Sequence, residues 1–127
     1  MQPGDALQPR TYGPVDSEKM KTLAAILRDP NVIHIDRDLV RGRGLGDKLI
    51  NQGPTNLGYV TNMLEANFGP GSIARLVVRF QSNVFEDDVV TAAGTVTEVG
   101  DAEVTCEVWL ERQDGSRAVE GTAVVRS

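Results

Sequence analysis

The spacing of apolar residues divides the chain into a helical first half and a strand-rich second half. A first helix is predicted after Asp16 and Ser17, since either residue can cap a helix. Its apolar residues recur at the 3.6-residue spacing of one helix face: Met20, Leu23, Ala24 and Leu27. Pro30 then forces the chain out of the helix at Asp29. Only a weak strand is predicted before this helix, over residues 7–12.

A second and more apolar helix is predicted over residues 54–68. Gly53 precedes Pro54, and proline is favoured at the first helical position. One apolar stripe runs along this helix: Leu57, Val60, Leu64 and Phe68. The sequence Gly-Pro-Gly at 69–71 ends it. Between the two helices, residues 41–47 (RGRGLGD) are interpreted as a glycine-rich loop.

From residue 72 onward the apolar period changes from 3.6 to 2, which is typical of strands. Four strands are predicted, at residues 74–81, 89–99, 102–111 and 118–126. The turn sequence QDGS at 113–116 joins the last two. We expect a four-stranded antiparallel meander with one apolar face covered by the helix at 54–68, which is an α+β fold.

Composition narrows the class of protein. A length of 127 residues predicts a single domain, 1–127, with a real hydrophobic core. A net charge of −5 argues against a nucleic-acid or anionic membrane surface, and no apolar run approaches the roughly 20 residues of a membrane span. The N-terminus lacks the features of a signal peptide. The single cysteine, Cys106, lies on the apolar face of its strand, so we expect a packed thiol and a cytoplasmic protein.

The single histidine, His34, is the first candidate for chemistry. It follows Asp29 by five residues and has the apolar neighbours Ile33 and Ile35. Imidazole exchanges protons near neutral pH, and a carboxyl group in an apolar pocket can be tuned toward that range. The pair could therefore act as general acid and base. The spacing alone favours the alternative, a packed His34 bonded to a backbone carbonyl, with Asp29 capping a turn. One histidine and one cysteine give no metal-ligand cluster.

Three further features have two interpretations each. The N–H of Gly53, at a helix start, could stabilise an oxygen that gains negative charge, or Gly53 could simply cap the helix. The glycine-rich loop with Arg41 and Arg43 could contact phosphates or be a flexible surface loop. Three asparagines could line a pocket or cap turns: Asn51, Asn56 and Asn62.

The pattern D-x-N-x-x-H-x-D, formed by Asp29, Asn31, His34 and Asp36, resembles the signature of the MaoC-like, R-specific enoyl-CoA hydratases. That family also has a histidine-glycine pair at the start of its central helix and a second glycine five residues later. This chain has Gln52, Gly53 and Gly58 in the corresponding places. The resemblance covers residues 15–68 by motif and the rest by architecture. It implies the hot-dog fold, an antiparallel sheet wrapped around one long central helix.

The resemblance also implies an activity, the addition of water to the double bond of a trans-2-enoyl-CoA to give an R-3-hydroxyacyl-CoA. Asp29 and His34 would be the catalytic acid–base pair, and the Gly53 N–H would meet the thioester oxygen. Asn31 would hold the active-site turn, with Gln52 and Arg43 as further substrate contacts. CoA is then part of the substrate, and no separate cofactor or metal is expected.

The chain departs from the family pattern at several positions. Leu27 and Arg28 replace a serine-glycine pair, Val32 replaces a proline, and Gln52 replaces a histidine. The variant motif also resembles the small subunits of heteromeric hydratases that act on steroid side-chain CoA thioesters. The alternatives are therefore a non-catalytic or co-catalytic subunit that completes a partner's acyl-CoA site, or an acyl-CoA thioesterase. We expect a homodimer or a heteromer with another MaoC-like chain.

Overall fold

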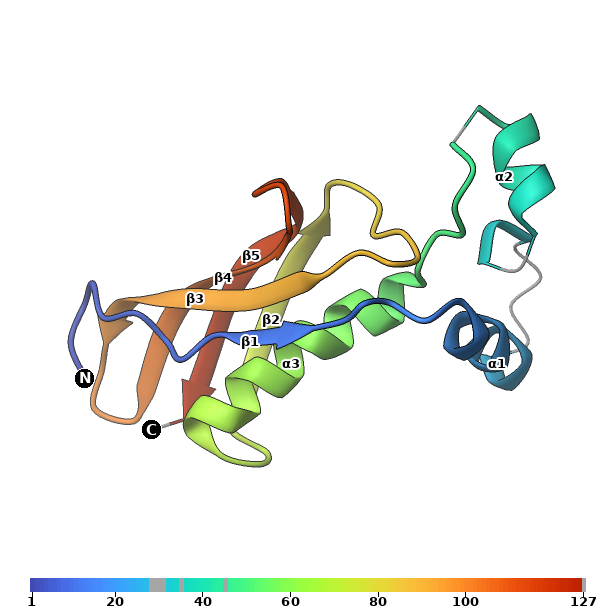
Figure 1. Ribbon diagram of the computed structural model, residues 1–127. Coiled ribbons are helices and arrows are strands. Elements are labelled where there is room, and N and C mark those ends of the chain that lie inside the picture. The colour runs from blue at the N-terminus through green and yellow to red at the C-terminus, as the bar shows by residue number, and fades with distance from the viewer. Residues whose placement is uncertain (28–31, 35, 45, 127) are drawn as a thin grey trace.

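The computed structural model of the protein describes residues 1–27, 32–34, 36–44 and 46–126. In chain order they form β1 (Arg10–Tyr12), α1 (Ser17–Leu27), the short 3₁₀ helix η1 (Val32–His34), α2 (Arg37–Gly42), α3 (Gly53–Phe68), β2 (Ile73–Phe80), β3 (Val90–Val99), β4 (Glu103–Arg112) and β5 (Arg117–Arg126). The strands make one antiparallel sheet in the order β1-β3-β4-β5-β2, and α1 and α2 lie at the end of the sheet where α3 begins (Figure 1). The α+β prediction is confirmed. Over these residues, no helix is long and apolar enough to cross a membrane.

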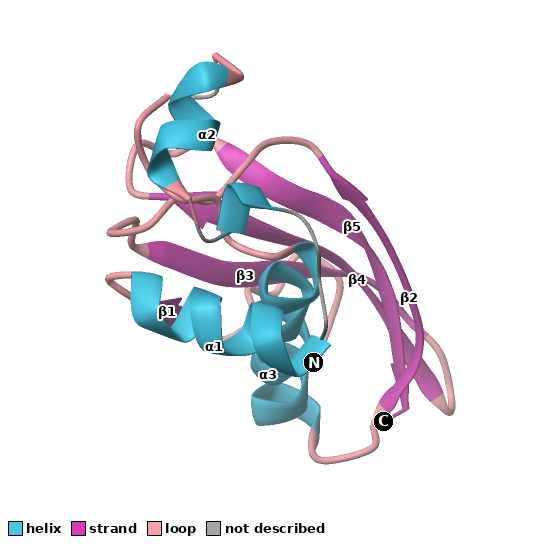
Figure 2. Ribbon diagram, turned by 90° about the vertical axis from the view of Figure 1, so that its right-hand side faces the viewer, coloured by secondary structure: helices cyan, strands magenta, loops and turns pink. Residues whose placement is uncertain are grey.

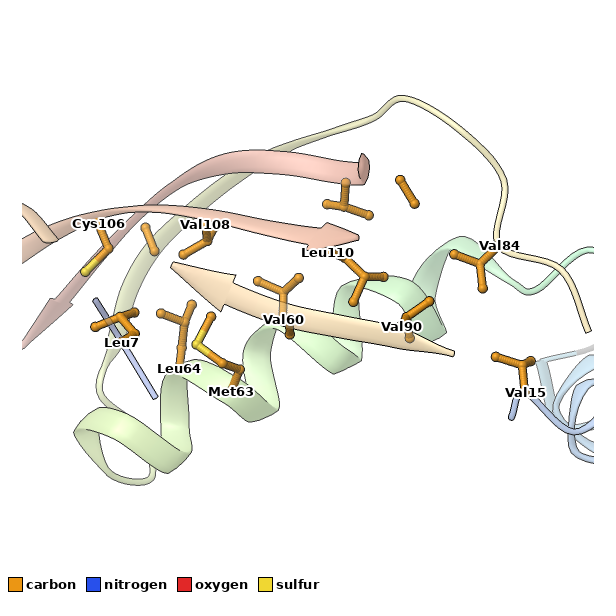
Figure 3. Packing of buried hydrophobic residues seen from close by; sticks show 14 of the residues in the cluster. Leu7, Val15, Val60, Met63, Leu64, Val84, Val90, Cys106, Val108 and Leu110 are labelled. Carbon is orange, nitrogen blue, oxygen red and sulfur yellow. The ribbon is translucent and has the colours of Figure 1, made fainter. Parts of the chain in front are cut away.

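The sheet curves around α3, which packs lengthwise against its concave face (Figure 2). Three side chains on one face of α3 are fully buried: Val60, Met63 and Leu64. They meet the inward-facing residues of β3 and β4, among them Val90, Val108 and Leu110 (Figure 3). Each such side chain contributes about 1.5–3 kcal/mol by leaving water. The strand alternation and the helical stripe read from the sequence thus meet in one core.

Cys106 lies on the core side of β4 and is fully buried. Burial raises the pKa of its thiol, because the charged thiolate is disfavoured away from water. The prediction of a packed thiol is confirmed.

The predicted four-stranded meander is wrong for its first strand. β3, β4 and β5 do follow one another as neighbours, but β2 pairs with β5 at the opposite edge of the sheet. The connection between β2 and β3 is not a hairpin turn, because its backbone bonds elsewhere. The Asn51 N–H donates to the Val84 carbonyl at 2.7 Å, and the Asp87 N–H donates to the Val15 carbonyl at 2.8 Å.

The predicted glycine-rich loop starts too early, because Arg41 and Gly42 belong to α2. Asp36 caps this helix by accepting hydrogen bonds from the N–H groups of Asp38 (2.9 Å) and Leu39 (3.2 Å). By contrast, α1 begins where the sequence predicted. The side chain of Asp16 caps it, accepting from the Glu18 N–H at 2.8 Å.

Two glycine substitutions should change stability in opposite directions. A Cβ atom at Gly58, inside α3, would meet no atom within 4 Å, so Gly58→Ala should raise the free energy of unfolding by about 0.5–1 kcal/mol. A Cβ atom at Gly121, in β5, would lie 2.0 Å from the Val77 carbonyl oxygen, so Gly121→Ala should lower it by about 1–3 kcal/mol. Urea unfolding of both variants checks this. If the two substitutions changed the free energy of unfolding equally, the close packing of β5 on β2 would be contradicted.

Candidate functional site

The start of α3 is fixed by a short backbone pairing outside the main sheet. Ile50 and Phe85 form an antiparallel bridge. On either side of it, the Asn51 N–H donates to the Val84 carbonyl, and the Glu86 N–H donates to the Leu49 carbonyl at 2.8 Å. This pairing holds residues 49–51 as an extended lead into the helix. The side chains and main-chain atoms that follow, from Asn51 to Asn56, therefore have defined positions.

Glu86 closes this pairing with its side chain. It is 4% exposed and accepts a hydrogen bond from the Leu49 N–H at 3.0 Å. Arg37, the first residue of α2, donates to the two carboxylate oxygens at 2.6 and 2.5 Å. The hydrogen bonds from Arg37 hold the pKa of Glu86 below its ordinary value against the opposing effect of burial, and the Leu49 N–H lowers it further. Glu86 therefore attaches α2 to the strand that precedes α3.

His34 is attached to the same strand. Its side chain is buried, and its Nδ1 lies 2.6 Å from the Ile50 carbonyl oxygen, while the Ile50 N–H donates to the Ile33 carbonyl at 3.0 Å. Because a carbonyl oxygen can only accept, Nδ1 carries the proton in this contact. In the neutral ring the lone pair then belongs to Nε2, the form that can take a proton from water. The bond to a backbone carbonyl, expected for a packed His34, is therefore present. The same bond sets the tautomer of the neutral ring that acid–base chemistry needs.

Gly53 is the first residue of α3 and stands three residues after Ile50. Pro54 has no N–H, and the N–H groups of Thr55 and Asn56 both donate to the Gln52 carbonyl at 3.1 Å. Among the residues that the structure describes, the Gly53 N–H has no hydrogen-bond acceptor. A Cβ atom at Gly53 would only touch the ring of Phe80, at 3.7 Å, so packing within the chain does not require glycine there. An unpaired N–H at the positive end of a helix can bind an oxyanion.

Gln52 connects α1 to the start of α3. It is 1% exposed, and its Nε2 donates to the Met20 carbonyl at 2.8 Å. This contact also fixes the orientation of the amide, because only the nitrogen end can donate to a carbonyl. The other end, Oε1, is buried without a hydrogen-bond partner in the described part of the chain.

A cavity of about 310 Å³ lies beside this helix start. Its wall comes from three segments, the chain after β1, one face of α1 and the first two turns of α3 with the residues before them. The lining residues are Tyr12–Asp16, Lys19, Met20, Leu23, Asn51, Gln52, Thr55 and Tyr59. Its volume is at the lower end of the range of cavities that hold small ligands.

A polar network borders the cavity. The Asn51 side chain donates to Asn56 Oδ1 at 3.0 Å and lies 3.4 Å from the Tyr59 hydroxyl, and the rings of Tyr12 and Tyr59 stack with centroids 4.6 Å apart. Burial raises the pKa of Tyr59, so its hydroxyl stays protonated at neutral pH. The sequence left open whether the asparagines line a pocket. Asn51 does line it, with Asn56 as its partner, whereas Asn62 is exposed on α3.

Of the six predicted site residues, His34 contacts Ile50, which stands two residues before Gln52 and three before Gly53. Gln52 is a lining residue of the cavity, whereas His34 and Gly53 are not. Arg43 is exposed at the end of α2, and its side chain makes no hydrogen bond or ion pair with the described residues. Asp29 and Asn31 lie outside the described residues. Among the described residues, no group of three or more His, Cys, Asp or Glu side chains could hold a metal ion.

Sequence reasoning missed Glu86, Tyr12 and Thr55. Glu86 stands in the run FEDD, where an acidic residue next to an aromatic one gives no sign of burial. Tyr12 comes from a strand of three residues, too short for a clear periodicity. Thr55 is one helical turn after Gln52, and that spacing was the one available signal.

Comparison with known proteins identifies the family of the chain. A sequence model described as the MaoC like domain matches residues 1–116. The chain belongs to the MaoC-like domain family. Among curated proteins, no significant match is found.

Solved structures resemble this MaoC-like domain over nearly its whole length. A chain of the ChsH1-ChsH2 complex from Mycobacterium tuberculosis is 25% identical, with a TM-score of 0.83, and the match covers 98% of this chain and 96% of that one. The (R)-hydratase from A. caviae involved in PHA biosynthesis is 23% identical, with a TM-score of 0.86 and the same coverage. R-hydratase PhaJ1 from Pseudomonas aeruginosa is 20% identical, with a TM-score of 0.84, over 100% of this chain and 82% of that one. The predicted hot-dog fold is confirmed.

Replacing Glu86 should weaken this MaoC-like domain and change its response to acid. The folded pKa of Glu86 is lowered, so its contribution to stability is complete above the ordinary pKa of a glutamate, about 4.3, and is lost as the pH falls through the lower folded value. Glu86→Gln should lower the free energy of unfolding at neutral pH by about 1 kcal/mol, a modest value because Arg37 is half exposed. It should also make that free energy less dependent on pH below 4.3. Urea unfolding measured at several pH values checks this, with Glu103→Gln, at an exposed position, as control.

Proposed function

We propose that this MaoC-like domain is an enoyl-CoA hydratase that adds water across the double bond of a trans-2-enoyl-CoA to give an R-3-hydroxyacyl-CoA. The observation that carries the proposal is the bond between His34 Nδ1 and the Ile50 carbonyl. Nδ1 donates in this contact, so the lone pair of the neutral ring belongs to Nε2, and Ile50 stands three residues before Gly53, whose N–H has no acceptor among the described residues. The similarity in fold to two R-hydratases supports the same reaction class.

The proposed reaction needs a base, an acid and a site for negative charge. Asp29 and His34 bind the attacking water, and a proton leaves that water as its oxygen bonds to C3 of the substrate. The electron pair of the double bond moves toward the thioester, whose oxygen gains negative charge. A proton then returns to C2, so that the net change is the addition of one water molecule. His34 supplies the general-base nitrogen, and Asp29 shares the proton.

The Gly53 N–H is the proposed donor to the thioester oxygen. As the first N–H of α3 it adds the positive end of the helix dipole to its hydrogen bond. Such a donor acts on the charge that develops in the transition state, so its effect is on rate more than on binding. Gln52 contributes by fixing the position of α1 against this helix start through Met20.

A second candidate is a role as one subunit of a two-component hydratase. Two structural neighbours come from such assemblies, the ChsH1-ChsH2 complex and the HadBC (3R-hydroxyacyl-ACP dehydratase) complex from Mycobacterium tuberculosis. The position of Gln52, where the family usually has histidine, favours a divided site. In this arrangement the chain would pair with another MaoC-like chain and act on a bulkier acyl group, such as a steroid side chain.

Removal of either acid–base group should abolish most of the hydratase activity. Asp29→Asn and His34→Gln should each lower kcat by about 10²–10⁴-fold, because each removes a proton-transfer group. Asp47→Asn, which alters an exposed aspartate, is the matched control and should retain the rate. Loss of enoyl absorbance measures hydration, and release of free thiol from saturated acyl-CoA measures thioesterase activity. An Asp29→Asn variant that hydrates at the original rate would end the assignment.

The subunit composition can be tested separately. The mass of the purified protein, alone and co-expressed with MaoC-like chains encoded beside it, distinguishes a homodimer from a heteromer. If the homomer hydrates crotonyl-CoA and bulkier enoyl-CoAs, the first proposal stands. If hydration requires the second chain, the divided site is correct.

A further inference from the structure

Three buried polar atoms around the cavity have no hydrogen-bond partner among the described residues. They are Gln52 Oε1, the Tyr12 hydroxyl and Thr55 Oγ1. All three residues line the same cavity, although they come from different segments of the chain. A buried polar atom without a partner is uncommon in folded proteins, and three around one cavity point to a common cause.

The rest of the chain shows that such atoms are normally satisfied. The hydroxyl of Thr61, six residues after Thr55 on α3, donates to the Gly58 carbonyl at 3.0 Å. Asn51 and Asn56, beside the cavity, bond to each other. The unpaired atoms are therefore not a general feature of α3. They belong to residues that line the cavity, and one of these residues, Gln52, adjoins the proposed donor Gly53.

The chemistry of the three atoms specifies what could satisfy them. Gln52 Oε1 is an acceptor only, because the nitrogen of that amide is used by Met20. It needs a donor from outside the chain. The hydroxyl groups of Tyr12 and Thr55 can donate or accept. A hydroxyl group satisfies such a set, since it donates to Gln52 while accepting from Tyr12 or Thr55. A plain alkyl chain would leave all three atoms unpaired.

The position of the atoms indicates which part of a substrate would meet them. From Gln52 to Tyr59, whose ring stacks on Tyr12, α3 advances by about 10 Å at 1.5 Å per residue. With the thioester at the Gly53 N–H, as proposed above, an acyl chain that enters the cavity would pass Gln52 first and Thr55 and Tyr59 further along α3. Met20 and Leu23 of α1 give that chain an apolar side.

We infer that this cavity selects acyl groups that carry a hydroxyl substituent beyond C3, with Gln52 Oε1 as its acceptor and Tyr12 or Thr55 as its donor. The inference rests on the proposed acyl-CoA site and names its substrate class. An unsubstituted chain of equal length is the disfavoured competitor, because it would bury the three polar atoms without partners.

Binding of saturated acyl-CoAs tests the inference without depending on hydration. Octanoyl-CoA is compared by calorimetry with octanoyl-CoAs hydroxylated at successive carbons of the distal half of the chain. At least one hydroxylated form should bind about 10-fold to 100-fold more tightly. Thr55→Val and Tyr12→Phe should reduce this ratio, whereas Thr61→Val, a matched change on the same helix, should leave it unchanged. Equal binding of all forms, or binding of none, would overturn the inference.

The stability of the ligand-free protein gives an independent measurement. Removal of an unpaired buried hydroxyl, which Thr55→Val replaces by a methyl group and Tyr12→Phe by a hydrogen atom, should raise the melting temperature by roughly 2–8 °C. Thr61→Val removes a satisfied hydroxyl and should not raise it. If Thr55→Val and Tyr12→Phe both destabilise the protein, ordered water satisfies these atoms, and the inference is wrong. If no enoyl-CoA is hydrated but the binding preference is present, the proposed reaction fails while the inference stands.

Discussion

The arrangement of the site depends on the pairing of residues 49–51 with residues 84–86. These two segments come from either side of α3 and β2 and lie outside the main sheet. Glu86 holds the pair together, since it bonds the Leu49 N–H and receives Arg37 from α2. The pairing sets the path of the backbone that leads into α3. The main core of α3 lies further along the helix, at Val60 and beyond.

Each candidate group reaches the site through that segment. His34 is held by the Ile50 carbonyl, α1 is held by Gln52, and the Gly53 N–H follows directly. The helices α1 and α2 lie at one end of α3 and the sheet (Figure 1), and Met20 of α1 and Val40 of α2 are buried in the same core cluster as α3. The candidate site therefore lies where the start of α3 meets α1 and η1, beside a cavity lined by residues of β1, α1 and α3. A preformed cavity of this kind can admit a ligand without disturbing the core.

The sequence predicted those features that depend on periodicity. Strands β3, β4 and β5 and helices α1 and α3 were found because each buries one face, and burial imposes a period of 2 or 3.6. The edge assignment of β2 was missed, since alternation says which face is buried but not which neighbour is paired. Of the predicted site residues, His34, Gln52 and Gly53 lie at or near the start of α3, and their roles stay predictions. Glu86 and Tyr12 were missed because their partners are far away in sequence, at Arg37 and Tyr59.

Features that cost stability are concentrated at the start of α3. Gly53 is a glycine that the packing of the chain does not require, its N–H lacks an acceptor among the described residues, and Gln52 buries an oxygen without a partner. Each feature costs stability, and none is compensated within the described chain. In the sheet, by contrast, the residue type fits the packing. Gly121 of β5 lies so close to Val77 of β2 that no side chain would fit there. Proteins keep such costs at sites where a ligand removes them, so the helix start, and not the sheet, is where we propose that a substrate binds.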